Sequence, residues 1–318
     1  MPNNSFIVTP APHIKSGVTT QKIMRMVILA LLPAGLAGIY IYGFSSLNVI
    51  CISILSCLLT EIIFLKFRNK DTRLVLDGSA ILTGLLLAYN LPPGVPFWIP
   101  IVGGVVSIIL GKQIFGGLGQ NIFNPALVGR AFLQISWPVY MTIWQNPRWW
   151  PDVVSSATPL AKEVSSHFSY MDLFLGNHAG SLGEVCVIAL LIGAIFLLFT
   201  KIISLHIPLS FIGTVGVITW IFGKEGFFKG DFIFNILSGG LILGAFFMAT
   251  DYVTSPLTKK GRIIFGIGCG VLTAIIRLRG SYPEGVCYSI LFMNAAVPII
   301  DRFTKTEKYG LLRPGSTS

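Results

Sequence analysis

The chain has 318 residues, of which 53% are hydrophobic and 11% are charged, and its mean hydropathy is +0.76. Soluble domains carry about 25% charged residues, so this composition excludes a soluble globular protein and indicates an integral membrane protein. The formal net charge is +10, but the basic residues lie in short clusters between apolar stretches, where they set membrane topology, and nucleic-acid binding is excluded.

Ten apolar stretches are candidates for membrane-spanning helices, because a bilayer core about 30 Å thick needs about 20 apolar residues per helix. Residues 1–23 precede them as a polar, uncleaved tail without the apolar region of a signal peptide. Glycine and proline in residues 90–96 and 116–125 predict short or broken helices there. The expected spans cover residues 24–43, 46–65, 75–90, 96–112, 124–137, 184–200, 206–222, 232–250, 262–276 and 284–300.

The distribution of positive charge predicts on which side of the membrane each loop lies. Most of the 23 lysine and arginine residues fall on the side that holds both termini, and the 6 tryptophans fall at or beyond the opposite ends of the spans. The positive-inside rule therefore places both termini in the cytoplasm and the long polar interval 138–183 outside. Arg277 and Arg279 are exceptions on the outer face, and they have either a specific anionic partner or a simple interfacial position.

The two halves of the chain resemble each other, which predicts an internal repeat. Residues 81–88 are similar to 236–245, and residues 123–126 parallel 293–296. Each half holds five spans, and this odd number makes the second half enter the membrane in the opposite sense. We therefore expect an all-α membrane protein of two inverted five-helix repeats, with a working site near the midplane at their interface. The expected domain organisation begins with a cytoplasmic tail (1–23), the first repeat (24–137) and an outer loop (138–183). The second repeat (184–300) and a second cytoplasmic tail (301–318) follow.

Two polar features lie where such a repeat would place a site. Asn121 and Asn124 stand in a glycine-rich turn before Pro125, where free backbone N–H groups and side-chain amides suit an anion or a polar heterocycle. The alternative is an asparagine helix cap, with glycines for close packing. Asp251 ends the eighth span, and a carboxylate so near hydrocarbon is a functional candidate. Its alternative is ion pairing with the basic cluster 259–262.

A third polar feature is the hydroxyl-rich stretch 152–160, which contains Thr158 and lies in the long outer interval. By itself it is typical of a solvated serine/threonine turn. The 5 cysteines form no C-x-x-C pair and the 4 histidines have no metal-ligand spacing, so the sequence predicts neither a metal site nor a nucleophile paired with a base.

Four stretches carry a resemblance to a known family. They are GGLGQNIFNPALVGRA at 116–131, DVVSSATPL at 152–160, MATDYVTSP at 248–256, and the segment 261–294. Together they resemble the D subunit of the Rnf complex, an ion-translocating ferredoxin:NAD oxidoreductase, and its relative, the B subunit of the sodium-pumping NADH:quinone oxidoreductase. The chain length and the absence of an N-terminal extension are more similar to the Rnf protein. The resemblance implies a membrane electron-transfer subunit in a prokaryotic inner membrane, working with iron–sulfur and flavin-carrying subunits.

The same resemblance implies two flavins. FMN is expected to be attached through its phosphate to Thr158 by a separate flavin transferase, so Thr158 would be an attachment point and not a catalytic residue. Ser156 stands where the family usually has glycine, which puts the geometry of that turn in question. A non-covalent riboflavin is expected near the cytoplasmic side of the membrane, at Asn121, Asn124 and Asp251. The repeat alone would equally suit a flavin-free channel or transporter of small polar solutes.

Overall fold

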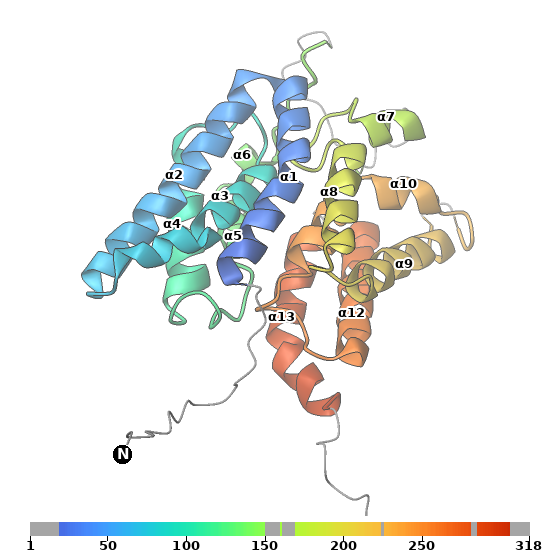
Figure 1. Ribbon diagram of the computed structural model, residues 1–318. Helices are drawn as coiled ribbons and strands as arrows, with labels where there is room; N and C mark the ends of the chain where they lie inside the picture. Colours follow the sequence, from blue (N-terminus) through green and yellow to red (C-terminus); the bar gives the residue numbers. More distant parts are fainter. Residues whose placement is uncertain (1–18, 150–159, 161–168, 224–225, 281–284, 306–318) are drawn as a thin grey trace, which may run out of the picture.

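The computed structural model describes residues 19–149, 160, 169–223, 226–280 and 285–305, and every regular element within these ranges is a helix (Figure 1). The expected all-α class is confirmed. Four helices are long and apolar enough to cross a bilayer: α1 (Thr20–Tyr42), α2 (Phe44–Phe67), α12 (Lys259–Arg279) and α13 (Val286–Phe303). The shorter apolar helices are α3 (Ser79–Tyr89), α4 (Trp98–Ile108) with its π-helical continuation η2 (Ile109–Gln113), α8 (Val187–Phe199) and α9 (His206–Ile221).

Broken helices occur where the sequence predicts them and at one further place. Helix α3 ends at Tyr89 and η2 ends at Gln113, so the chain is non-helical around both expected breaks. The continuous span expected over 232–250 is wrong, because that segment is interrupted at Ser238, Gly239 and Gly240. The elements not yet named are the 3-10 helix η1 (Thr72–Asp77), α5 (Pro125–Ser136), α6 (Pro138–Thr142), α7 (Tyr170–Leu175), α10 (Phe232–Leu237), α11 (Leu241–Leu243) and the π-helical turn η3 (Gly244–Met248).

A single glycine joins the two longest helices. Gly43 has a φ of 78°, and its N–H donates to the Ile39 carbonyl to end α1, while α2 begins at the next residue. A Cβ on Gly43 would collide with the guanidinium of Arg148. Glycine is therefore favoured here by the backbone conformation, and it makes α1 and α2 a tight hairpin.

The helices pack in two groups that meet along one side. In the first group α2 lies against α3 and α4, and α4 lies against α5; in the second, α9 lies against α12 and α12 against α13. The groups meet where α1 packs on α8 and α5 packs on α13 (Figure 1). One apolar core crosses this junction, with Leu31 and Leu87 from the first group and Phe211 and Phe265 from the second fully buried. The two groups therefore share one buried apolar core.

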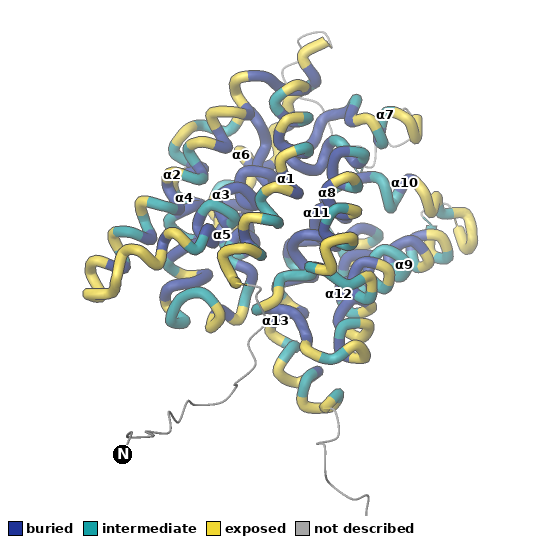
Figure 2. Tube along the Cα trace, viewed as in Figure 1, coloured by how far each residue is buried: buried dark blue, intermediate teal, exposed yellow. Residues whose placement is uncertain are grey.

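The exposed outer faces of the helices (yellow in Figure 2) carry many large apolar side chains. Leu36 on α1, Ile63 on α2 and Leu209 on α9 are each more than 60% exposed. Soluble proteins rarely expose a continuous surface of this kind, whereas a helix that faces lipid needs it.

Candidate functional site

A partly open cavity lies between the two groups of helices. The three residues that the sequence predicts for a membrane site, Asn121, Asn124 and Asp251, all line it. Its walls come from α1, α3, η2, the glycine-rich turn, the end of α8 and η3, so the cavity needs both halves of the chain.

The glycine-rich turn holds the two asparagines in different roles. Gly116, Gly117 and Gly119 have φ values of 121°, 111° and 92°, which residues with a side chain rarely adopt. The Oδ1 atom of Asn124 accepts from the Ala126 N–H at 3.1 Å and caps α5. The helix-cap alternative is therefore confirmed for Asn124.

Asn121 is the asparagine of this turn whose side chain has an acceptor available for a ligand. Its Nδ2 donates to the Phe123 carbonyl at 3.1 Å, but its Oδ1 is buried without a hydrogen-bond partner among the described residues. A buried acceptor without a partner costs about 1–3 kcal/mol. The side chain is 4% exposed and lines the cavity, so a donor group on a bound molecule would remove that cost.

Asp251 lies in the loop after η3 and lines the same cavity. It forms no ion pair with a described residue, and Arg262 donates instead to the Pro256 carbonyl and the Ser204 hydroxyl. The proposed pairing with the basic cluster is therefore wrong. Burial raises the pKa of Asp251 above its ordinary value, and hydrogen bonds from the Val253 N–H and the Thr254 hydroxyl partly oppose this rise.

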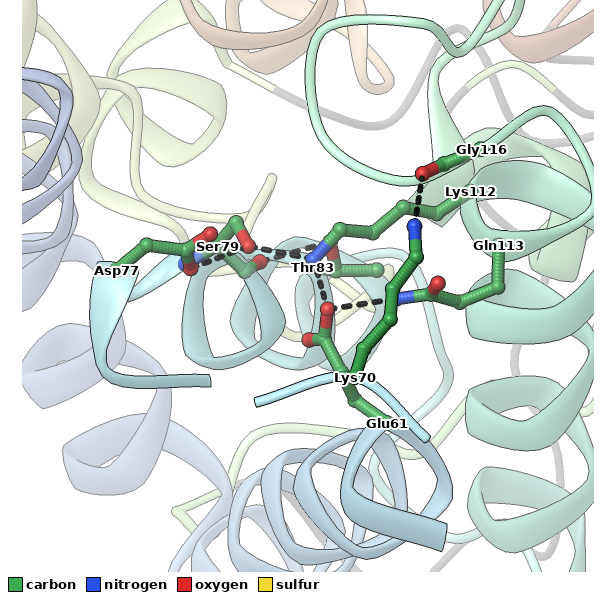
Figure 3. Close-up of polar contacts among 8 residues, drawn as sticks. All are labelled: Glu61, Lys70, Asp77, Ser79, Thr83, Lys112, Gln113 and Gly116. Atoms are coloured by element: carbon green, nitrogen blue, oxygen red, sulfur yellow. Dashed lines mark hydrogen bonds and ion pairs between the residues drawn. The ribbon is translucent and has the colours of Figure 1, made fainter. Parts of the chain in front are cut away.

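A buried cluster of charged and polar side chains borders the cavity and was not anticipated from the sequence (Figure 3). The Nζ atom of Lys112 lies 2.5 Å from Glu61 Oε1 and 2.5 Å from Ser79 Oγ. Gln113 Nε2 donates to the same Glu61 oxygen at 2.9 Å. Lys112, Gln113 and Glu61 are each no more than 3% exposed. This is an ion pair inside a membrane protein, and such groups mark functional pathways.

Neighbouring residues fix the position of this cluster. The Asp77 carboxylate accepts from the backbone N–H of Ser79 at 2.7 Å and from its hydroxyl at 2.5 Å. The hydroxyl oxygen of Ser79 is thereby turned to accept from Lys112. Lys112 and Gln113 are the last two residues of η2, and π-helical turns occur frequently at functional sites. A carboxylate at position 61 inside an apolar span is the sequence signal that could have identified the cluster.

A second buried cation connects elements beside the cavity. Arg130 on α5 is 4% exposed and donates to Asn90 Oδ1 at 2.5 Å, and Asn90 Nδ2 donates to the Leu86 carbonyl at the end of α3. Leu86 itself lines the cavity. Arg130 therefore ties α5 to the non-helical segment after α3, where backbone groups need partners.

The two arginines that the sequence predicts on the outer face have different surroundings. Arg277 is buried and donates to the carbonyls of Asn235 and Ser238, at 2.5 Å and 3.1 Å. These carbonyls belong to the C-terminal end of α10, so Arg277 stabilises the break in that segment. Arg279 is exposed. The position of Arg277 is therefore neither interfacial nor directed only at an external anion.

The predicted attachment residue Thr158 lies outside the described residues, and so does Ser156. Leu160 is described, and it lies over the same helix break: a Cβ on Gly239 would be 2.7 Å from Leu160 Cδ1. Leu160 thus lies beside Arg277, at the C-terminal end of α12.

Comparison with known proteins gives one family over nearly the whole chain. A model of the NQR2, RnfD, RnfE family matches residues 7–310. The D subunit of the proton-translocating ferredoxin:NAD(+) oxidoreductase complex of Clostridium ljungdahlii is 46% identical over 324 residues, covering 98% of each chain. The D subunit of the Na(+)-translocating ferredoxin:NAD(+) oxidoreductase complex of Acetobacterium woodii is 46% identical over 317 residues, covering 97% of this chain and 96% of its own. The D subunit of the ion-translocating oxidoreductase complex of Stutzerimonas stutzeri is 39% identical over 332 residues, covering 93% of each. The resemblance carried by the four stretches is confirmed, and this multi-pass membrane protein belongs to the NQR2, RnfD, RnfE family.

Proposed function

We propose that the chain is the membrane electron-transfer subunit of an ion-translocating ferredoxin:NAD oxidoreductase of the Rnf type. Similarity over nearly the full length to relatives whose names state that activity supports this function. The observation that carries it is the cavity at which Asn121, Asn124 and Asp251 meet, because these residues come from both halves of the chain. Membership of a sodium-pumping NADH:quinone oxidoreductase is the alternative, and the partners that copurify with the chain distinguish the two.

The cavity residues fit a non-covalent riboflavin. Phe246, Phe247 and Leu82 give the apolar walls that a flat ring requires, and the unpartnered Oδ1 of Asn121 is an acceptor for a ring N–H. Lys112 adds a buried positive charge. A bound flavin supplies the electron-transfer chemistry, while this chain supplies its position and its electrostatic surroundings.

A covalent FMN on Thr158 is the second part of the proposal, with a flavin transferase as the partner during maturation. Leu160, two residues after Thr158, lies near the C-terminal end of α12, whereas the Asp251 loop leads toward its N-terminal end. A helix of 21 residues is about 31 Å long at about 1.5 Å per residue. Two flavins placed in this way would lie near opposite faces of a bilayer, and electrons would pass between them.

We also infer the topology that this function requires. Ten spans would form two inverted five-helix repeats over residues 24–137 and 184–300. The protein would lie in the inner membrane of a prokaryotic cell, with residues 138–183 outside and both tails in the cytoplasm. The packing of α2 on α4 and of α4 on α5 has a counterpart in α9 on α12 and α12 on α13, which supports the repeat. Iron–sulfur and flavin-carrying subunits would be the redox partners.

Flavin analysis of the purified full chain tests the proposal. Wild-type protein made with its transferase should carry the mass of one FMN and should retain yellow fluorescence after denaturing electrophoresis, and Thr158→Ala should lose both. Wild-type protein should also release riboflavin on denaturation, and Thr158→Ala should still release it. A wild-type chain without either flavin would overturn the proposal and favour a channel or transporter.

A further inference from the structure

We infer that Lys112 is a further cofactor-binding residue of the cavity, whose ammonium group stabilises the negative charge that a bound flavin gains when it accepts an electron. The inference rests on the proposed riboflavin site and deepens it. The electron would come from a redox partner of the proposed complex, and each electron accepted adds one negative charge to the ring unless a proton follows it.

The hydrogen bonds of Lys112 leave one donor for a ligand. Its side chain is 2% exposed and lines the cavity with Asn121 and Asp251. Two acceptors of the ammonium are present among the described residues, Glu61 Oε1 and Ser79 Oγ, each at 2.5 Å. An ammonium has three N–H donors, so one of them has no acceptor among the described residues and is available to a ligand.

The ion pair has a direction with respect to the cavity. Lys112 and Ser79 line the cavity, whereas their partner Glu61 on α2 does not, and Figure 3 shows the contacts among the three. The positive partner of the pair is therefore the one at the cavity. Because the strength of a charge interaction falls with distance and is greater in a medium of low dielectric constant, the nearer positive charge dominates at the ligand.

Glu61 lowers the cost of burying the Lys112 ammonium, and the Ser79 hydroxyl is a second acceptor for it. A buried ammonium without a partner is costly, and a carboxylate at hydrogen-bond distance offsets that cost. Glu61 accepts from both Lys112 and Gln113, while its Oε2 has no partner among the described residues. The carboxylate thus holds the ammonium in place without cancelling its field at the cavity.

The alternative is that the pair only joins α2 to η2. A purely structural pair is not required for stability, because apolar side chains of similar volume often replace a buried ion pair at no cost. The two roles predict different shifts of the flavin potential. In an electrostatic role, removal of the positive partner and removal of the negative partner shift the potential in opposite directions. In a structural role they do not.

The experiment is a redox titration of the non-covalent flavin in the purified full chain, in the Thr158→Ala background, so that covalent FMN does not contribute. Glu61→Gln should raise the midpoint potential. Adding Lys112→Met to Glu61→Gln should lower it relative to Glu61→Gln alone by at least a tenfold change in the oxidised-to-reduced ratio, about 59 mV for a one-electron couple. These two proteins differ in the Lys112 ammonium, and neither leaves a buried carboxylate without its cation.

Lys70→Met is the matched control. Lys70 is an exposed lysine whose Nζ donates to the Gly116 carbonyl of the same turn at 3.5 Å, and it does not line the cavity. The flavin potential of Lys70→Met should equal that of the parent protein. Equal potentials for Glu61→Gln with and without Lys112→Met, in proteins that both retain riboflavin, would overturn the inference and leave the proposed function intact. Absence of riboflavin from the parent protein would instead overturn the proposed function.

Discussion

The side-chain amide of Asn124 donates a hydrogen bond of 3.3 Å to the carbonyl oxygen of Met248. Asn124 caps α5 in the first half of the chain, and Met248 is the last residue of η3 in the second. One asparagine therefore both starts a helix and joins the two halves at the wall of the cavity.

Asn124→Ala should destabilise the protein by about 2 kcal/mol, because it removes a helix cap worth about 1 kcal/mol and a cross-half hydrogen bond worth about 1 kcal/mol. Asn124→Ser keeps an oxygen for the cap and loses only the amide donor, so it should cost about half as much. Unfolding in detergent, followed by helical circular dichroism, measures both values. Equal losses for the two variants would show that the cap contributes nothing.

Asn121→Leu should separate stability from flavin binding. The substitution removes the hydrogen bond to the Phe123 carbonyl but also removes the unpartnered buried Oδ1, so the stability of the flavin-free protein should change by less than about 1 kcal/mol. The riboflavin released per chain should fall at least tenfold, while the FMN on Thr158 should stay. Asn146 also has a buried Oδ1 without a partner among the described residues and does not line the cavity, so Asn146→Leu should leave the riboflavin content unchanged.

Asp251 should make the stability of the protein depend on pH. Burial raises its pKa in the folded state above the ordinary value of 3.8, so the folded protein holds this proton more tightly than the unfolded chain. The resulting stabilisation is complete below the unfolded pKa and is lost as the pH rises through the folded pKa. The midpoint temperature of Asp251→Asn minus that of wild type should therefore increase from about pH 4 upward and then level off. A difference that is constant with pH would contradict the assignment.

Arg277 and Arg279 should differ strongly in their effect on stability. Arg277→Met leaves the carbonyls of Asn235 and Ser238 without their charged donor, and hydrogen bonds to charged groups contribute about 1.5–3 kcal/mol each. We expect a loss of about 3 kcal/mol in denaturant unfolding. Arg279→Met, at an exposed position two residues later, should change stability by no more than about 0.5 kcal/mol. Similar losses for both variants would show that the break after α10 does not depend on Arg277.

The fold was predictable where local chemistry determines it. Apolar length located the helices, and the glycines and prolines after Asn90 and before Pro125 located two of the breaks. The third break, at Gly239, was not predicted, because glycine pairs are common in continuous membrane helices. Its stability depends on Arg277, which lies far away in the sequence and reaches the freed carbonyls only in the folded protein.

The site was predictable only where a sequence motif marks its residues. Asn121, Asn124 and Asp251 were found through motifs that resemble a family, and the structure brings them to one cavity. The Lys112–Glu61 pair joins residues separated by 51 positions, and Lys112 by its sequence position resembles any other lysine at the end of a predicted span. No local pattern gives such a pairing. The assignment of Thr158 as the flavin attachment point stays a prediction.

Both π-helical turns border the cavity, η2 through Lys112 and η3 through Phe246 and Phe247. A π turn accommodates one residue more than an α turn. Deleting a single residue from either turn would restore a regular α-helix and would remove the widened turn from which these side chains reach the cavity. Chain length at these two positions is therefore constrained together with residue type, and homologous chains with a functional cavity should have neither insertions nor deletions there.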